Sequence, residues 1–197
     1  MTDDAPSGTN GTDSTADDSL PWETLASATA YSCPGFDVVR EEVRLPDGTE
    51  TDFDYVDEPA AVVVLALTPD DCVVVIEEWR EAVERVNRGF PAGTVEPDDD
   101  DPATAARREL EEETGYVADE LDHLTTVEPL NGLANSVHHH FIARGCRPTG
   151  DQRLDDDESI RVEATTRDKL LDTLAAGELR DGRTALCLLY HERFAEG

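Results

Sequence analysis

Two near-continuous apolar runs constrain the fold of this chain more than any other feature of its sequence. They are Ala60–Leu67 and Cys72–Trp79, and the turn sequence Thr68-Pro-Asp-Asp71 separates them. Apolar residues at successive positions, rather than at alternate ones, are typical of strands that are buried on both faces. The two runs therefore predict central strands of a sheet that is covered on both sides.

Further strands and helices are expected around this centre. Phe36–Leu45 and Thr51–Val56 alternate apolar with charged residues on either side of the turn at Pro46-Asp-Gly48, which predicts an antiparallel hairpin. Phe90–Asp101 contains two prolines and four consecutive aspartates and is predicted to be a loop. Other strands are expected around Leu124–Val127, Val137–Ala143 and Ile160–Ala164, and helices over Ala103–Thr114, Thr166–Ala176 and Arg183–Phe194. This mixture indicates an α/β or α+β fold.

The charge of the chain is strongly one-sided. It has 46 acidic residues against 16 basic ones, of which only Lys169 is a lysine, and its formal net charge is −30. Such a surface repels nucleic acids and anionic membranes, so neither is an expected partner. Like charges at this density destabilise a compact state, and salt screens them. The acidic, lysine-poor composition resembles that of cytosolic proteins from salt-loving microbes, and we expect a halophilic source.

Composition also divides the chain into parts. Residues 1–22 are mostly polar and acidic and are expected to be a disordered tail. Residues 23–57 hold the predicted hairpin, and residues 58–197 hold the other predicted elements. Met1–Leu20 has neither a basic start nor an apolar stretch, so we expect no signal peptide and a cytoplasmic protein.

Three glutamates on the helix expected after Pro102 carry the first chemical signal. Glu109, Glu112 and Glu113 are offset by three and four residues, so they share one face of that helix. Three like charges this close destabilise a helix, and a divalent cation would reverse that effect. Oxygen ligands suit Mg²⁺ or Mn²⁺ rather than zinc. The alternative is that this face is only solvated surface, as acidic runs usually are.

The residues around these glutamates resemble the Nudix box, the motif of the Nudix hydrolase family. Arg108-Glu-Leu-Glu-Glu-Glu-Thr-Gly-Tyr116 matches the second half of the box at every fixed position, and Gly93 matches the glycine that opens it. The interval from Gly93 to Arg108 is one residue longer than in the family. The family's first glutamate, which pairs with the arginine, is replaced by an aspartate, most simply Asp100.

Flanking segments resemble ADP-ribose pyrophosphatases and related nucleoside diphosphate-sugar hydrolases. Glu77-Glu-Trp-Arg-Glu-Ala-Val83 and Phe90-Pro-Ala-Gly-Thr-Val-Glu-Pro97 are similar to the stretch before the box in that subfamily, and residues 177–186 are similar to its ending. Residues 31–56 resemble its N-terminal β arm, which helps to build a dimer in relatives. Gly89 departs from the pattern, because the subfamily often has an acidic residue there.

The resemblance implies a Nudix α/β/α sandwich with a mixed central sheet, and an N-terminal β arm over residues 23–57 through which a homodimer forms. It implies Mg²⁺-dependent hydrolysis of a pyrophosphate bond in a nucleoside diphosphate derivative. ADP-ribose, split into AMP and ribose 5-phosphate, is the best single substrate, and another nucleotide sugar or a dinucleotide is the alternative. Selectivity is expected from the loop Leu130–Ser136. Rivals of a different class are a Nudix-fold nucleotide sensor without turnover and an acidic interaction domain.

The resemblance also implies roles for single residues. Those expected to bind the metal are Glu109, Glu112 and Glu113 with the Ala92 carbonyl, and Glu112 and Arg108 are expected to act in catalysis. The general base is expected on the acidic loop before Ile160, with Glu158 preferred to Asp156. Arg80 would contact a phosphate or form a structural salt bridge. His138–His140 receive no role, because histidines in a strand are more often partly buried than metal-bound.

Overall fold

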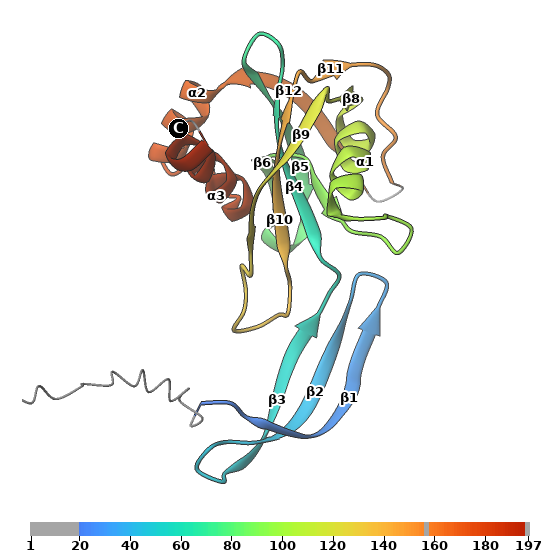
Figure 1. Cartoon of the computed structure of the whole chain (residues 1–197), viewed down its shortest axis with the longest axis vertical. Coiled ribbons are helices and arrows are strands. Elements are labelled where there is room, and N and C mark those ends of the chain that lie inside the picture. Colours follow the sequence, from blue (N-terminus) through green and yellow to red (C-terminus); the bar gives the residue numbers. More distant parts are fainter. Residues whose placement is uncertain (1–19, 156–157, 196–197) are drawn as a thin grey trace, which may run out of the picture.

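The computed structural model describes residues 20–155 and 158–195. These residues form a three-stranded sheet at one end of the molecule and a seven-stranded sheet flanked by helices at the other, as Figure 1 shows. Most of the predicted acidic tail, residues 1–19, lies outside the described residues, as does Asp156. Within the described residues no helix is both long enough and apolar enough to cross a membrane.

The three-stranded sheet contains the predicted hairpin. β2 (Phe36–Arg44) and β3 (Glu50–Asp57) pair antiparallel, and β1 (Glu23–Cys33) adds a third antiparallel strand along β2. The sheet is joined to the rest of the chain by backbone hydrogen bonds, in which Val56 N–H donates to the Leu133 carbonyl at 2.9 Å and Asn135 N–H donates to the Val56 carbonyl at 3.1 Å. We call β1–β3 the arm.

The central sheet is mixed, as predicted. Its strand order is β12 (Ile160–Thr166), β5 (Cys72–Arg80), β4 (Ala61–Leu67), β10 (His138–Arg144) and β9 (Glu120–Val127). β6 (Arg85–Gly89) pairs with β5 and β7 (Ala92–Thr94) pairs with β4. Only the β4–β10 pair is parallel among the pairs of this sheet in the described residues, and β8 (Tyr116–Val117) pairs separately with β11 (Arg147–Pro148).

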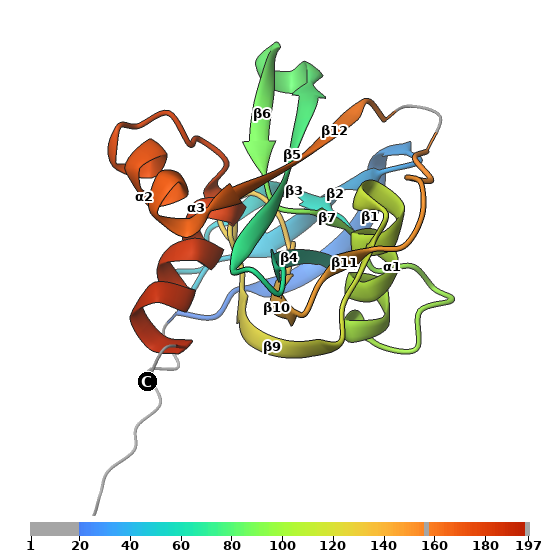
Figure 2. The ribbon, with the colours of Figure 1, turned by 90° about the horizontal axis from the view of Figure 1, so that it is seen from above.

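Helices cover both faces of β4 and β5, which confirms the interpretation of the two apolar runs. Val63 and Leu65 of β4 belong to a buried cluster with side chains of α2 (Arg167–Ala175) and α3 (Gly182–Tyr190). Val62 and Val64, which alternate with them, pack in a second cluster with α1 (Pro102–Thr114). Figure 2 shows α1 on one side of the sheet and α2 and α3 on the other. The order is therefore helix, sheet, helix.

The structure differs from these expectations at three places along the chain. The segment predicted as one loop, Phe90–Asp101, begins with the short strand β7, because Ala92 to Thr94 pair with Val63 to Ala61 of β4. Another strand, β6, follows the 3-10 turn η1 (Glu81–Val83) and was not foreseen. The last α-helix ends at Tyr190 rather than Phe194, and a π-helical turn, η2 (His191–Ala195), follows it.

One buried histidine makes stability depend on pH. His140 of β10 is fully buried, and burial lowers the pKa of its imidazole to about 4 from an ordinary 6.5. Its pKa in the unfolded chain stays higher, so the unfolded state takes up a proton first as the pH falls. The stability linked to neutral His140 is therefore present above pH 6.5 and is lost as the pH falls toward 4.

We expect His140→Gln to remove this part of the pH dependence, about 1.5 kcal/mol between pH 6.5 and 5. Urea unfolding of the wild type and the variant at both pH values, in high KCl, measures it. His139→Gln on the opposite side of β10 is the control and should remove less, because His139 is only partly buried. Equal pH dependence of the wild type and His140→Gln would contradict the prediction.

Candidate active site

The helix α1 begins and ends as the sequence predicts. Asp101 is its N-cap, and its carboxylate accepts a hydrogen bond from Thr104 N–H at 2.8 Å. Pro102 occupies the first helical position, and Gly115 ends the helix in a left-handed conformation with φ of 71°. The two caps fix the ends of the helix that carries residues 108–113.

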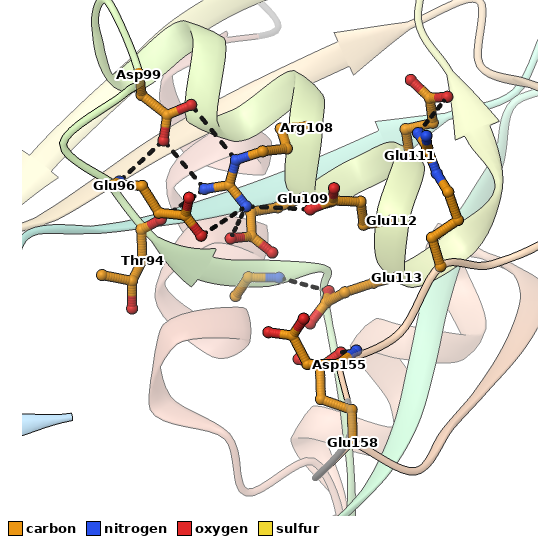
Figure 3. A network of polar contacts seen from close by, with 12 residues as sticks. Thr94, Glu96, Asp99, Arg108, Glu109, Glu111, Glu112, Glu113, Asp155 and Glu158 are labelled. Carbon is orange, nitrogen blue, oxygen red and sulfur yellow. Dashed lines mark hydrogen bonds and ion pairs between the residues drawn. The ribbon is translucent and has the colours of Figure 1, made fainter. Parts of the chain in front are cut away.

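Arg108 is the centre of a network that joins the helix to the loop before it. Its Nη1 donates to Glu109 at 2.8 Å and to Glu112 at 3.1 Å, as the dashed lines in Figure 3 show. Its Nη2 donates to the Thr94 carbonyl at 2.8 Å and to Asp99 at 3.0 Å. Burial lowers the pKa of the Arg108 guanidinium, but its bonds to these carboxylates outweigh that effect and raise it. The arginine is thus charged and fixed in place.

The acid that pairs with Arg108 is Asp99, so the expectation of Asp100 is wrong. Asp99 accepts from Nε and Nη2 of Arg108, and it also accepts from the backbone N–H of Glu96 at 2.9 Å. The hydrogen bonds from Arg108 lower the pKa of the Asp99 carboxyl. Asp100 is exposed. The turn from Glu96 to Asp99 determines which aspartate faces the arginine. A run of four identical residues, Asp98–Asp101, gives no sign of where that turn lies.

Two of the three glutamates are buried beneath this network. Glu113 accepts from the Ala92 N–H at 2.9 Å, and only 2% of Glu113 is exposed. Burial raises the pKa of Glu113 to about 8, with further contributions from Glu109 and Glu158. Burial also raises the pKa of Glu109. These carboxylates are costly to ionise where they lie, and a positive charge beside them would lower that cost.

Gly93 lets the β7 backbone approach the helix closely. A Cβ at this position would collide with the carboxylate of Glu109. A side chain here would displace either the strand or the glutamate. The glycine that opens the motif is therefore required for the close approach of backbone to carboxylate.

The predicted general base lies opposite the helix. Glu158 precedes β12 and accepts a hydrogen bond from Asp155 N–H at 3.1 Å, and Glu158 N–H donates back to the Asp155 carbonyl at 3.1 Å. In Figure 3, Glu158 and Asp155 lie on the loop below Glu113. The charge of Glu158 contributes to the raised pKa values of Glu109 and Glu113, so the three carboxylates are electrostatically coupled.

A cavity of about 440 Å³ brings these elements together. Its walls include Gly93, Glu109, Glu112 and Glu158 from the predicted site, together with Ala92 and Arg80. Arg80 also forms an ion pair with Glu78 at 2.7 Å, so both interpretations weighed for it are compatible with the structure.

Sequence reasoning gave no individual role to several residues of this cavity. Glu58, His138 and Arg183 line it, and so does Ser136, the last residue of the loop that was expected to set selectivity. Glu78 lies nearby, and burial raises the pKa of its carboxyl. The Glu-Glu-Trp-Arg sequence places Glu78 close to Arg80, but no local pattern identifies the other four, because they meet only through the fold.

The possible metal ligands around Glu109 are of the chemical type that a hard divalent cation prefers. They are carboxylate oxygens and a backbone carbonyl, which Mg²⁺ prefers. In the described part of the chain no three His, Cys, Asp or Glu side chains converge tightly enough to hold a metal as they stand. Arg108 contacts one oxygen each of Glu109 and Glu112, which leaves the other oxygen of each carboxylate for a cation.

Known proteins resemble this chain over most of its length. A family model described as the NUDIX domain matches residues 57–184. The ADP-ribose pyrophosphatase of Bacillus subtilis (strain 168) is 34% identical over 173 residues, which cover 87% of this chain and 93% of that protein. The methanol dehydrogenase activator of Bacillus methanolicus is 31% identical over 151 residues, which cover 76% of this chain and 81% of that protein.

A solved structure shows the same fold. A crystal structure of an ADP compounds hydrolase aligns with a TM-score of 0.79 at 22% identity, over 91% of this chain and 97% of the other. At this identity the likeness concerns the fold. It confirms the predicted mixed α/β architecture.

The pairing of Asp99 with Arg108 can be tested by comparing the stability of variants at Asp99 and at its neighbour Asp100. We expect Asp99→Asn to destabilise the fold by about 1–3 kcal/mol, because the charged guanidinium loses an almost buried ionic partner. Asp100→Asn removes the same charge one residue away and should change stability by less than about 0.5 kcal/mol. Urea unfolding in high KCl measures both variants. Equal effects would show that neither aspartate is the specific partner of Arg108.

Proposed function

The chain belongs to the Nudix family, and we propose that it hydrolyses the pyrophosphate bond of a nucleoside diphosphate derivative, with ADP-ribose as the substrate. The products would be AMP and ribose 5-phosphate. The observation that carries the proposal is the pair of carboxylates, buried Glu109 and partly buried Glu112, that Arg108 fixes on one wall of a cavity large enough for part of a nucleotide. The named activity of the Bacillus subtilis relative supports ADP-ribose among the possible substrates.

Nudix hydrolases generally use divalent metal ions, and we propose Mg²⁺ for this chain, with Mn²⁺ as a substitute. Glu109, Glu112 and Glu113 would hold it, with the Ala92 carbonyl as a further ligand. When bound, such ions neutralise the diphosphate and lower the pKa of a water. The raised pKa of Glu113, about 8, means that a cation would bind in competition with a proton there.

Other residues would bind, orient and move protons. Arg108 holds Glu109 and Glu112 at fixed positions, which supports its role as the residue that orients the ligands. Glu158 lines the cavity opposite the helix, where it could take a proton from an attacking water. Asp155 N–H fixes its carboxylate. Arg80, paired with Glu78, could contact a phosphate while keeping that pair.

The rival proposals differ in what the same site does. A different nucleotide sugar or a dinucleotide would use the same carboxylates with another fit in the cavity. A nucleotide sensor would bind without turnover, and an interaction domain would need no ordered network at all. The convergence of Arg108, Glu109 and Glu112 on one wall of the cavity favours hydrolysis, since binding alone does not require these carboxylates.

The experiment incubates the protein with ADP-ribose and Mg²⁺ at high KCl. Chromatography measures the AMP that is released. We expect Glu112→Gln, Glu113→Gln and Glu158→Gln each to reduce kcat by about 100-fold or more, because each removes a carboxylate that is proposed to bind the metal or to accept a proton. Glu111→Gln is the matched control, since Glu111 lies on the same helix but pairs with Arg153 at 2.7 Å.

The outcomes separate the proposals. Absence of AMP with the wild type rejects ADP-ribose, and a panel containing GDP-mannose and dinucleotides then tests the other substrates. Binding of a nucleotide without turnover of any of them supports the sensor. Full activity of both Glu112→Gln and Glu113→Gln would refute the metal ligands proposed here.

The acidic, lysine-poor composition supports a proposal that the protein works in a salt-rich cytoplasm.

We also propose that two copies of the chain associate through the arm, residues 23–57. All of β1 except Cys33 is exposed. Trp22 and Phe53 form an edge-to-face pair with centroids 5.7 Å apart, and both are exposed. Exposed aromatic side chains gathered on a sheet are typical of surfaces that another protein covers.

Light scattering of the purified chain tests the dimer. We expect a dimeric mass for the wild type and a monomeric mass for Phe53→Glu, because the new charge would be buried without a partner. Thr49→Glu adds the same charge at the β2–β3 turn and should remain dimeric. A monomeric mass for the wild type would overturn the proposal.

A further inference from the structure

The cavity is lined by two arginines whose carboxylate partners lie outside the helix α1. Of its four arginines, Arg108 is held by four carboxylates, and Arg153 pairs with Glu111 and is 64% exposed. Arg80 and Arg183 are less exposed, and each has one carboxylate partner in the described structure. They also share a small recess beside Glu78. Each of these two guanidinium groups has more N–H donors than its one carboxylate partner uses, so the pair could hold an anion in a chain whose net charge is −30.

Arg183 is held in a defined orientation by the start of α3. Asp181 is the N-cap of this helix and accepts from Arg183 N–H at 2.8 Å. The same carboxylate accepts from the Arg183 side chain, from Nε at 3.4 Å and from Nη2 at 3.1 Å. No hydrogen bond within residues 20–155 and 158–195 uses Nη1 of Arg183. The guanidinium is therefore fixed on one side and has donors to spare on the other.

Unpaired polar atoms lie next to it. Ser136 Oγ and His138 Nδ1 are buried, line the same cavity, and have no hydrogen-bond partner among the described residues. Only 1% of Ser136 is exposed. Buried polar groups are nearly always paired, with water or a ligand if not with protein. Arg183 and Glu58 line the same cavity as Ser136 and His138, so the four residues surround one space.

We propose that Arg183 binds a phosphate of the substrate in this part of the cavity, with Ser136 and His138 hydrogen-bonded to the hydroxyls of the adjoining ribose. The inference rests on the proposed function and adds a subsite to it. The acidic helix and this subsite lie on one continuous cavity, so a diphosphate could reach from one to the other. A phosphate that reached both Arg80 and Arg183 would accept charge-assisted hydrogen bonds from two guanidinium groups.

The pairing with Asp181 explains why an arginine suits this position. A lysine could also donate to a carboxylate and a phosphate at once, but it lacks the planar fork of N–H groups that fixes the orientation of the guanidinium. Substitution of Arg183 leaves the backbone cap in place, because the N–H groups of residues 183 and 184 still donate to Asp181. Arg183→Gln should therefore keep its fold.

Calorimetric binding tests the proposal with the α,β-methylene analogue of ADP-ribose, which resists hydrolysis, and Mg²⁺ in high KCl. We expect Kd to rise about tenfold or more for Arg183→Gln and to rise less for Arg183→Lys. If the second ribose of ADP-ribose lies beside Ser136, Ser136→Ala should weaken binding of this analogue. It should not weaken binding of α,β-methylene ADP, which lacks the second ribose. Weakened binding of both ligands would place the adenosine ribose here instead.

Arg180→Gln is the matched control, because the Arg180 side chain contacts only the Gly177 carbonyl among the described residues, and it should bind like the wild type. In the ADP-ribose assay, Arg183→Gln should raise KM by a similar factor while kcat changes by less than about twofold. Wild-type affinity in Arg183→Gln would overturn this inference and leave the proposed function standing. Failure of the wild type to bind the analogue would overturn both, and thermal melting confirms that each variant is folded.

Discussion

The bonds of Arg108 are the interaction on which the site depends. One guanidinium joins the loop after β7, through Thr94 and Asp99, to the helix face that carries Glu109 and Glu112. Without it, three carboxylates on one helical face would repel one another, and the loop would have no fixed position against the helix. With it, the carboxylates are close together yet keep oxygens for a cation. The arrangement is ordered before any substrate arrives.

The central elements could be predicted because their signals are local. The apolar runs gave β4 and β5, and Asp101, Pro102 and Gly115 gave the bounds of α1. Elements without a local signal were missed. β1 alternates mainly small residues, alanine with serine and threonine, so its pattern carries little hydrophobic signal. β7 is a three-residue strand between prolines, and its pairing with β4 has no local signal. Here tertiary contacts outweigh local preference.

The site follows the same rule. The helical carboxylates could be predicted, because spacing on a helix translates directly into a shared face. The partner of Arg108 could not, since only the turn at Glu96 distinguishes Asp99 from its neighbours. Arg183 and Ser136 reach the cavity from a helix and a loop that are distant in the sequence. No spacing rule connects residues whose meeting depends on the order of strands in the sheet.

The arm has a consequence for the shape of the cavity. Gly35, in the turn between β1 and β2, lines the cavity together with Glu58 and Pro59 at the arm's base. Part of one wall of the cavity is therefore built by a segment that hydrogen bonds of Val56 and Asp57 join to the loop at Leu133 and Asn135. The carboxylates of α1 lie on another wall of the same cavity. A substitution in the turn at Gly35 could therefore change the shape of the substrate space without altering the residues proposed to perform the chemistry.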